Sequence, residues 1–144
     1  MYMTMVRMVI ASRLEEISRV IDKVDELRKS HPIPDDDANA ICVVLDELLS
    51  NSIRHGLAEA PDHEISVKID WSDAEVIVAI VDDGIEFDPT RAPGPDTSGG
   101  LMERKIGGLG IPFVRKFADR FEYERVEGRN RVTVCRRIDP ARAG

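Results

Sequence analysis

The sequence is short of basic residues and cysteine, and it has no long hydrophobic run. Its 20 lysines and arginines are outnumbered by 27 aspartates and glutamates, which gives a formal net charge of −7. This balance argues against nucleic-acid binding, because neutralising phosphates requires a basic surface. The most apolar stretch, residues 75–81, is too short to cross a bilayer, and residues 1–10 lack the hydrophobic region of a signal peptide. We therefore expect a cytoplasmic protein that binds a protein partner or a small ligand.

The chain has only two cysteines, Cys42 and Cys135, and no spacing typical of zinc ligands. We expect two buried thiols rather than a disulfide or a metal site. The 144 residues, 42% of them hydrophobic and 33% charged, suit one soluble domain with its own core. We therefore expect a single domain over residues 1–144, and we find no internal repeat.

Hydrophobic periodicity predicts the element order β-α-α-β-β-loop-α-β-β. The expected strands cover residues 3–10, 63–71, 74–81, 120–126 and 131–137, and the expected helices cover residues 12–29, residues 34–56 and a segment after Gly110. Ser12 and Glu15 have the spacing of a capping box at the start of the first helix. The unbroken apolar strand 74–81 is typical of a central strand covered on both faces. This order predicts an α+β two-layer sandwich with a mixed, mostly antiparallel sheet and helices on one face.

The second predicted helix carries a stripe of polar residues. In the segment LDELLSNSIRHG, residues 45–56, Glu47, Asn51 and His55 follow one another at intervals of one helical turn. The stripe is either the solvated shoulder of an amphipathic helix or part of a binding site, because half-buried polar groups need partners. An amide oxygen can ligate Mg²⁺, and a carboxylate one turn away can accept a proton. A bound nucleotide would explain all of these residues.

The stretch VDDGIEFDP follows the apolar strand directly. Asp82 lies at the strand end, where its carboxylate could accept a hydrogen bond from the exocyclic amine of adenine. Gly84 would let the backbone approach a flat ring. The alternative is a simple Asp-Gly turn.

The stretch GGLGIPFVRKF places a glycine cluster at the start of the third helix. Free backbone amides at a helix N-terminus can bind phosphate, although the cluster could equally be a flexible hinge. No Gly-Lys-[Ser/Thr] follows, and no G-x-G-x-x-G opens the first βα unit, so Walker A and dinucleotide-binding motifs are excluded.

Together these stretches resemble a known superfamily in their order and spacing. Glu47-x-x-x-Asn51, Asp82-x-Gly84 and Gly108-x-Gly110 are similar to the N, G1 and G2 boxes of the ATP-binding superfamily that unites gyrase, histidine kinases and mismatch-repair ATPases, which has the Bergerat fold. Within that superfamily, the single-domain layout and the stretches DDGIEFDP, GGLGIPFVRKFADRFEYER and GRNRVTV look most like the anti-sigma factor serine kinases. The resemblance extends from about Ser12 to Arg137.

The resemblance implies roles for the motif residues. Asn51 would coordinate Mg²⁺, and Glu47 would be the general base that activates the attacking hydroxyl. Asp82 would read the adenine amine, and Gly84 would let the base approach.

The resemblance also implies an ATP lid over about residues 84–106, a loop whose length suggests a function. Arg104 and Lys105 in this lid are candidates to touch the phosphates, or they are a solvated charge pair. His55 is a candidate contact for phosphate or for the lid. The backbone groups that would hold the phosphates are those of Gly108, Leu109 and Gly110.

Two positions depart from the pattern of the family. Glu86 stands where a second glycine is expected after Asp82-x-Gly84, which adds a negative charge at the rim of the pocket. Asn130 stands where relatives have a threonine near the adenine, and its amide can still form hydrogen bonds.

The resemblance therefore implies an ATP- and Mg²⁺-dependent serine kinase. Its implied substrate is a serine of an anti-anti-sigma protein, its second implied partner is a sigma factor, and a homodimer is conceivable through the first strand. The main alternative is a non-catalytic ATP-binding module whose lid gates partner binding. A third reading is an ATPase that uses water as the acceptor. A complete histidine kinase is disfavoured, because no predicted helix pair carries a phospho-acceptor histidine.

Overall fold

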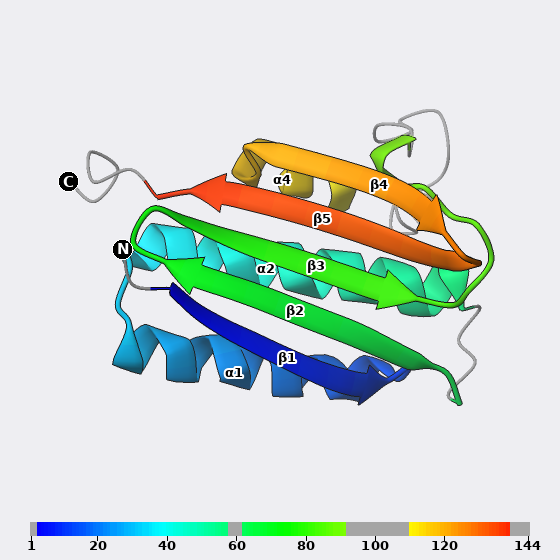
Figure 1. Cartoon of the computed structure of the whole chain (residues 1–144), viewed down its shortest axis with the longest axis horizontal. Coiled ribbons are helices and arrows are strands. Elements are labelled where there is room, and N and C mark those ends of the chain that lie inside the picture. Colours follow the sequence, from blue (N-terminus) through cyan, green and yellow to red (C-terminus); the bar gives the residue numbers. More distant parts are fainter. Residues whose placement is uncertain (1–2, 58–61, 92–109, 139–144) are drawn as a thin grey trace, which may run out of the picture.

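The computed structural model describes residues 3–57, 62–91 and 110–138, which form a five-stranded sheet with helices behind it (Figure 1). The strands are β1 (Met3–Ala11), β2 (Glu64–Ser72), β3 (Glu75–Asp82), β4 (Arg120–Val126) and β5 (Arg129–Arg137). Their spatial order is β1-β2-β3-β5-β4, and every neighbouring pair is antiparallel. The predicted α+β sandwich is confirmed, with a sheet that is antiparallel throughout the described strands.

The helical elements also occur in the predicted order. They are η1 (Leu14–Glu16), α1 (Ile17–Ser30), α2 (Asp35–Asn51), η2 (Ser52–Gly56), η3 (Pro89–Arg91) and α4 (Gly110–Phe117). The predicted capping box is wrong, because η1 has Arg13 at its N-cap and no side-chain cap. Ser12 instead accepts a hydrogen bond from the backbone N–H of His63 at 3.2 Å. Its hydroxyl therefore joins the end of β1 to the start of β2.

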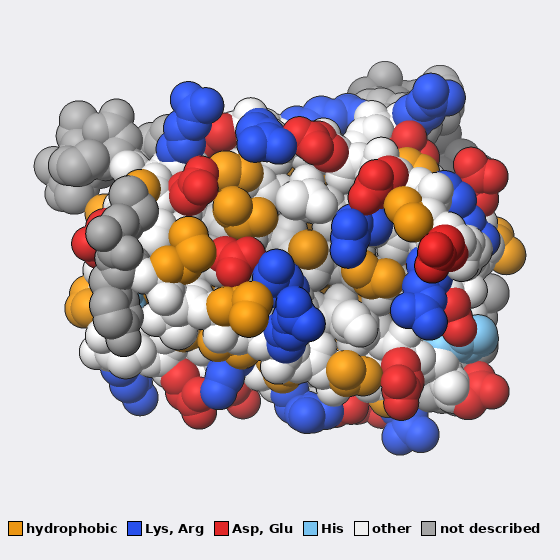
Figure 2. Space-filling model, viewed as in Figure 1, with side chains coloured by type: hydrophobic (Ala, Val, Ile, Leu, Met, Phe, Trp, Pro, Cys, Tyr) orange, Lys and Arg blue, Asp and Glu red, His pale blue; other side chains and the backbone are white. Residues whose placement is uncertain are grey.

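The hydrophobic core lies between the sheet and the helices. Alternate residues of each strand face the helices, and those of β2 are almost completely buried: Ile65, Val67, Ile69 and Trp71. The prediction that the central strand is covered on both faces is wrong. Only alternate residues of β3 are buried, while Ile77, Ala79 and Val81 are half-buried on the open face of the sheet. Figure 2 shows that face, where hydrophobic side chains are scattered among charged ones.

Both cysteines are free thiols, as predicted. Cys135 is buried, and burial together with the neighbouring Glu75 carboxylate raises the pKa of its thiol to about 11. Cys42 is only half-buried. None of the described helices is both long and apolar enough to cross a membrane.

A buried ion pair joins α2, α4 and β5. Asp37, in the first turn of α2, is completely buried, and its Oδ1 accepts a hydrogen bond of 2.8 Å from Nε of Arg136 on β5. The same guanidinium donates to the carbonyl of Phe117 at 2.7 Å and lies 5.9 Å from the centroid of its ring. Arg136 therefore fixes the last turn of α4 against the sheet.

We expect Arg136→Met to lower the free energy of unfolding by about 3 kcal/mol, because it leaves the buried Asp37 carboxylate without its cation. Urea denaturation monitored by circular dichroism would measure the change. The control is Arg131→Met, which removes a pair with Glu124 whose side chains are 53% and 55% exposed. That change should stay within about 0.5 kcal/mol of wild type, and equal losses in both variants would contradict this role of the buried pair.

Candidate functional site

The polar stripe on α2 continues into a π-helical turn. Glu47 and Asn51 lie on α2, and His55 lies in η2, where the N–H of Leu57 donates to the carbonyl of Ser52 at 2.9 Å. All three stripe residues are half-buried. π-Turns are rare, and those that do occur are often found at functional sites. The sequence predicted a helix to residue 56, but not this widening of its last turn.

The π-turn places its final carbonyl against the loop that follows β3. The oxygen of Gly56 accepts a hydrogen bond of 2.9 Å from the backbone N–H of Ile85. A Cβ at Gly84 would lie 2.3 Å from that oxygen, so only glycine fits between the helix end and the loop. The close packing of these two backbone segments therefore requires glycine at position 84, a requirement that the sequence did not reveal.

Asp82 and Asn130 meet beside this contact, as the resemblance implied. Asp82 is 5% exposed, and its Oδ1 accepts hydrogen bonds from Gly84 N–H at 2.9 Å and from Asn130 Nδ2 at 3.0 Å. Tyr123 and Arg125 on β4 donate to the other end of the Asn130 amide, at 2.6 and 3.1 Å. Sequence reasoning missed both β4 residues. Tyr123 and Arg125 are two residues apart in strand 120–126, which indicates that they share a face. Only the pairing register of β4 with β5 places that face beside Asn130.

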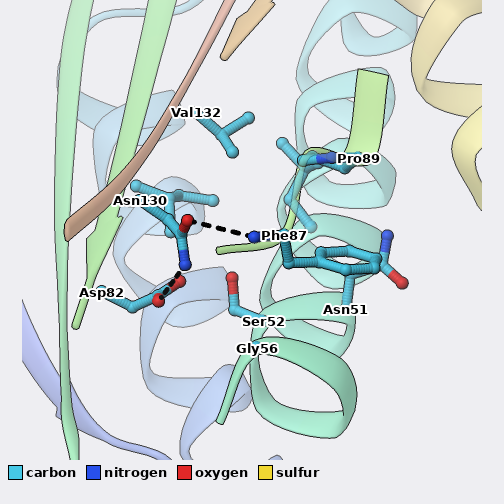
Figure 3. A pocket seen from close by; sticks show the side chains of 10 residues that line it. Asn51, Ser52, Gly56, Asp82, Phe87, Pro89, Asn130 and Val132 are labelled. Atoms are coloured by element: carbon cyan, nitrogen blue, oxygen red, sulfur yellow. Dashed lines mark hydrogen bonds between the residues drawn. The ribbon is translucent and has the colours of Figure 1, made fainter. Parts of the chain in front are cut away.

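A narrow cleft lies between α2 and the ends of β3 and β5 (Figure 3). Its apolar lining comes from Leu48, Ile80 and Val132, and its polar lining includes Asn51 and Asp82. The space that remains inside is about 10 Å³, which is room for roughly one water molecule.

The side chain of Phe87 forms part of the lining of this cleft. In Figure 3 its ring lies on the Asn51 side of the cleft, and it stacks on His55 with 5.3 Å between the ring centroids and 19° between the planes. A flat aromatic ring of the chain itself therefore lines the cleft. Sequence reasoning did not single out Phe87 as a residue of the pocket.

The side chain of Glu47, a residue of α2, lies against the start of α4. A Cβ on Gly110, the first residue of that helix, would lie 1.8 Å from Oε2 of Glu47, so the carboxylate sits directly against the glycine. Burial raises the pKa of Glu47, the negative charge of Asp46 raises it further, and Arg54 partly opposes both. Glu47 and Gly110, which belong to two different predicted motifs, are thus brought into contact.

Several predicted site residues lie outside the described parts of the chain. They are Arg104, Lys105, Gly108 and Leu109, together with most of the expected lid over residues 84–106. Its described beginning includes the exposed Glu86 and the short helix η3. Within the described ranges, no group of three or more His, Cys, Asp or Glu side chains could hold a metal ion.

The sequence matches the histidine kinase-like ATPase domain family over residues 10–136. It is 30% identical to the serine/threonine-protein kinase BtrW of Bordetella bronchiseptica over 95 residues, which are 66% of this chain and 67% of that protein. It is 26% identical to the anti-sigma F factor of Oceanobacillus iheyensis over 119 residues, which are 81% of this chain and 70% of that protein.

Two solved structures from Erythrobacter litoralis share the fold at 14% sequence identity. The histidine kinase domain of the EL346 blue-light activated histidine kinase aligns with a TM-score of 0.50 over 90% of this chain and 62% of that one. The EL346 blue-light activated histidine kinase itself aligns with a TM-score of 0.52 over 86% of this chain and 41% of that one. The chain therefore spans less than two thirds of either structure.

We expect Glu47→Gln to gain stability relative to wild type as the pH rises. The folded state raises the pKa of Glu47 above its ordinary value of 4.5, so folding favours the protonated carboxyl. The free energy of unfolding therefore falls as the pH increases from the pKa of the unfolded state to that of the folded state. Glutamine removes this dependence. Urea denaturation of both proteins at pH 4, 5, 6 and 7 would measure it, with Glu127→Gln in the exposed β4–β5 turn as control. A difference between Glu47→Gln and wild type that does not grow with pH would contradict the prediction.

Proposed function

Because the chain belongs to the histidine kinase-like ATPase domain family, we propose that it binds ATP and transfers the γ-phosphoryl group to a protein serine. The observation that carries this proposal is the arrangement around α2. Glu47 and Asn51 lie one turn apart on the helix, Asp82 lines the same cleft as Asn51, and Gly110 begins α4 against Glu47. The names of the two curated relatives, a serine/threonine kinase and an anti-sigma factor, support this choice.

The cleft beside Asp82 is the proposed site of the adenine. Its apolar walls suit a flat base, and the carboxylate can accept a hydrogen bond from the exocyclic amine of adenine. Guanine carries a carbonyl oxygen at the corresponding position, which the carboxylate would repel. Since Phe87 lines this narrow cleft, its ring would have to move when a base enters.

The phosphates would then extend along α2 toward the start of α4. We propose that the amide oxygen of Asn51 ligates Mg²⁺, which supplies positive charge to neutralise the phosphates. Backbone N–H groups of Gly110 and of the preceding Gly108 and Leu109 would bind phosphate oxygens. Arg104, Lys105 and His55 are proposed as further contacts.

Glu47 is the proposed general base. It would take the proton from the serine hydroxyl while the serine oxygen forms a bond to the γ-phosphorus, and the bond between that phosphorus and the leaving ADP breaks. Burial suits this role, because a carboxylate with a raised pKa is a stronger base. The proposed substrate is an anti-anti-sigma protein, and the second proposed partner is a sigma factor that the chain sequesters.

A non-catalytic ATP-binding module is the alternative function. Two observations favour it: Phe87 narrows the cleft by lining it, and the exposed Glu86 next to Phe87 adds a negative charge. In this case nucleotide binding would rearrange the proposed lid over residues 84–106 and thereby change a docking surface, with no transfer of phosphate.

We further propose that the chain works in the cytoplasm and dimerises through β1. This strand lies at one edge of the described sheet, and Met3, Met5 and Val9 on its open side are each about half exposed, at 51%, 52% and 50%. A second copy could pair with the free edge and cover these side chains. Sedimentation should show a dimer for wild type and a monomer for Met5→Lys, and an equally monomeric wild type would contradict the proposal.

The kinase proposal is tested with labelled ATP, Mg²⁺ and candidate anti-anti-sigma proteins. We expect label on a partner serine, located by mass spectrometry. Glu47→Gln should lower the transfer rate by at least about 100-fold while ATP still binds, because it removes the base and leaves the adenine cleft intact. Glu127→Gln is the matched control and should transfer at the wild-type rate.

The other outcomes separate the alternatives. Free phosphate without a labelled partner would indicate an ATPase. Tight ATP binding with no turnover, unchanged in Glu47→Gln, would leave only the binding module.

A further inference from the structure

Three polar side chains form a row across the end of the sheet nearest the cleft. Asn130 on β5 pairs directly with Asp82 on β3 in one direction and with Arg125 on β4 in the other. Because residues directly opposite one another in a sheet share a face, all three lie on the side that faces the helices. The row therefore runs from carboxylate through amide to guanidinium.

Arg125 is an exposed residue on the outermost described strand, and its guanidinium reaches Asn130 on the neighbouring strand. Its Nη1 donates to Oδ1 of Asn130 at 3.1 Å and to the backbone carbonyl of Gly84 at 2.8 Å. Gly84, in the loop that follows Asp82, also donates its own backbone N–H to Asp82 at 2.9 Å. One guanidinium thus holds both the residue next to Asp82 across the sheet and the loop that follows Asp82.

The Asn130 amide is fully occupied by the chain itself. Its Nδ2 donates to Asp82 Oδ1 at 3.0 Å and to the carbonyl of Ile85 at 2.8 Å, which uses both amide hydrogens. Its Oδ1 accepts from Tyr123, Arg125 and the backbone N–H of Phe87. Burial, and next the charge of Glu86, raise the pKa of Tyr123, so its hydroxyl stays a donor. Asn130 therefore has one fixed orientation.

We infer that Arg125 is a positioning residue for base recognition, acting through Asn130 to aim the carboxylate of Asp82. This inference rests on the proposed function, in which Asp82 reads the adenine amine.

The chemistry of the row supports this role. A cationic donor on the amide oxygen polarises the amide and strengthens the bond that its N–H makes to Asp82. Both hydrogen bonds that the described residues donate to Asp82 go to Oδ1. The other oxygen, Oδ2, is left for an incoming amine. Within the described parts of the chain, Asp82 is thus held in place without an ion pair to a cation that would compete for that oxygen.

Calorimetric titration of the full chain with ADP and with GDP, both with Mg²⁺, tests the inference. Wild type should prefer ADP. Arg125→Met should weaken ADP binding about tenfold and change GDP binding less than threefold, because the loss falls on recognition of the amine. Arg125→Lys retains a cationic donor and should recover most of the ADP affinity. The matched control is Arg131→Met on the opposite face of β5, which should bind both nucleotides like wild type.

A double-mutant cycle tests the route through Asn130. In an Asn130→Thr background the shorter side chain cannot join Arg125 to Asp82, so Arg125→Met should change ADP affinity less than threefold, and this remaining loss comes from its bond to the Gly84 carbonyl. The inference is overturned if Arg125→Met keeps the wild-type preference for ADP, or if it weakens both nucleotides equally, as a general loss of structure would.

Failure of the proposed function looks different from failure of this inference. A wild-type chain that binds neither nucleotide overturns both. A wild-type chain that prefers ADP, together with an unchanged Arg125→Met, overturns only the role of Arg125. Circular dichroism checks that Arg125→Met is folded, and NMR of the Asn130 side-chain amide reports on the bond itself: its two protons should be protected from exchange in wild type and less protected in Arg125→Met.

Discussion

The site depends on one backbone hydrogen bond, from Ile85 to the carbonyl of Gly56. It joins the end of α2 to the loop after β3, and these two segments carry the residues that the proposed function uses. The lack of a side chain at Gly84 allows them to approach so closely. Asp82 gains a hydrogen bond from the same glycine, so the carboxylate and the helix end are held by a single short loop. The cleft is the space that this contact leaves beside the core.

Much of the fold could be predicted, because it follows from local periodicity. Alternation and helical spacing predicted the strands, the helices and their order, whereas the grouping of Glu47, Asn51 and Asp82 in one site was implied only by the family resemblance. The wrong expectations concern contacts between distant segments. Ser12 has the spacing of a helix cap but bonds to His63, and the apolar β3 leaves Ile77 half-buried on an open face. Neither outcome is visible in a local window.

The missed site residues have the same cause. Phe87 lines the cleft, and its backbone N–H bonds to Asn130, which lies 43 residues further along the chain. Arg125 faces Asn130 because β4 and β5 pair in one particular register. The departure at position 130 also makes structural sense, since an amide can bond on both sides at once, to Asp82 and to Arg125, where a threonine hydroxyl would be too short to span the row.

The π-turn at Ser52–Gly56 carries one more residue than an α-helical turn would need. Removing that surplus residue would restore regular winding and rotate the last carbonyl by roughly 100° about the helix axis. The change would also displace Ile53 and Leu57, which are buried in the core in and just after the turn, and the link to the loop after β3 would be broken. The geometry of the cleft therefore depends on one inserted residue, which sequence comparisons that tolerate small gaps would overlook.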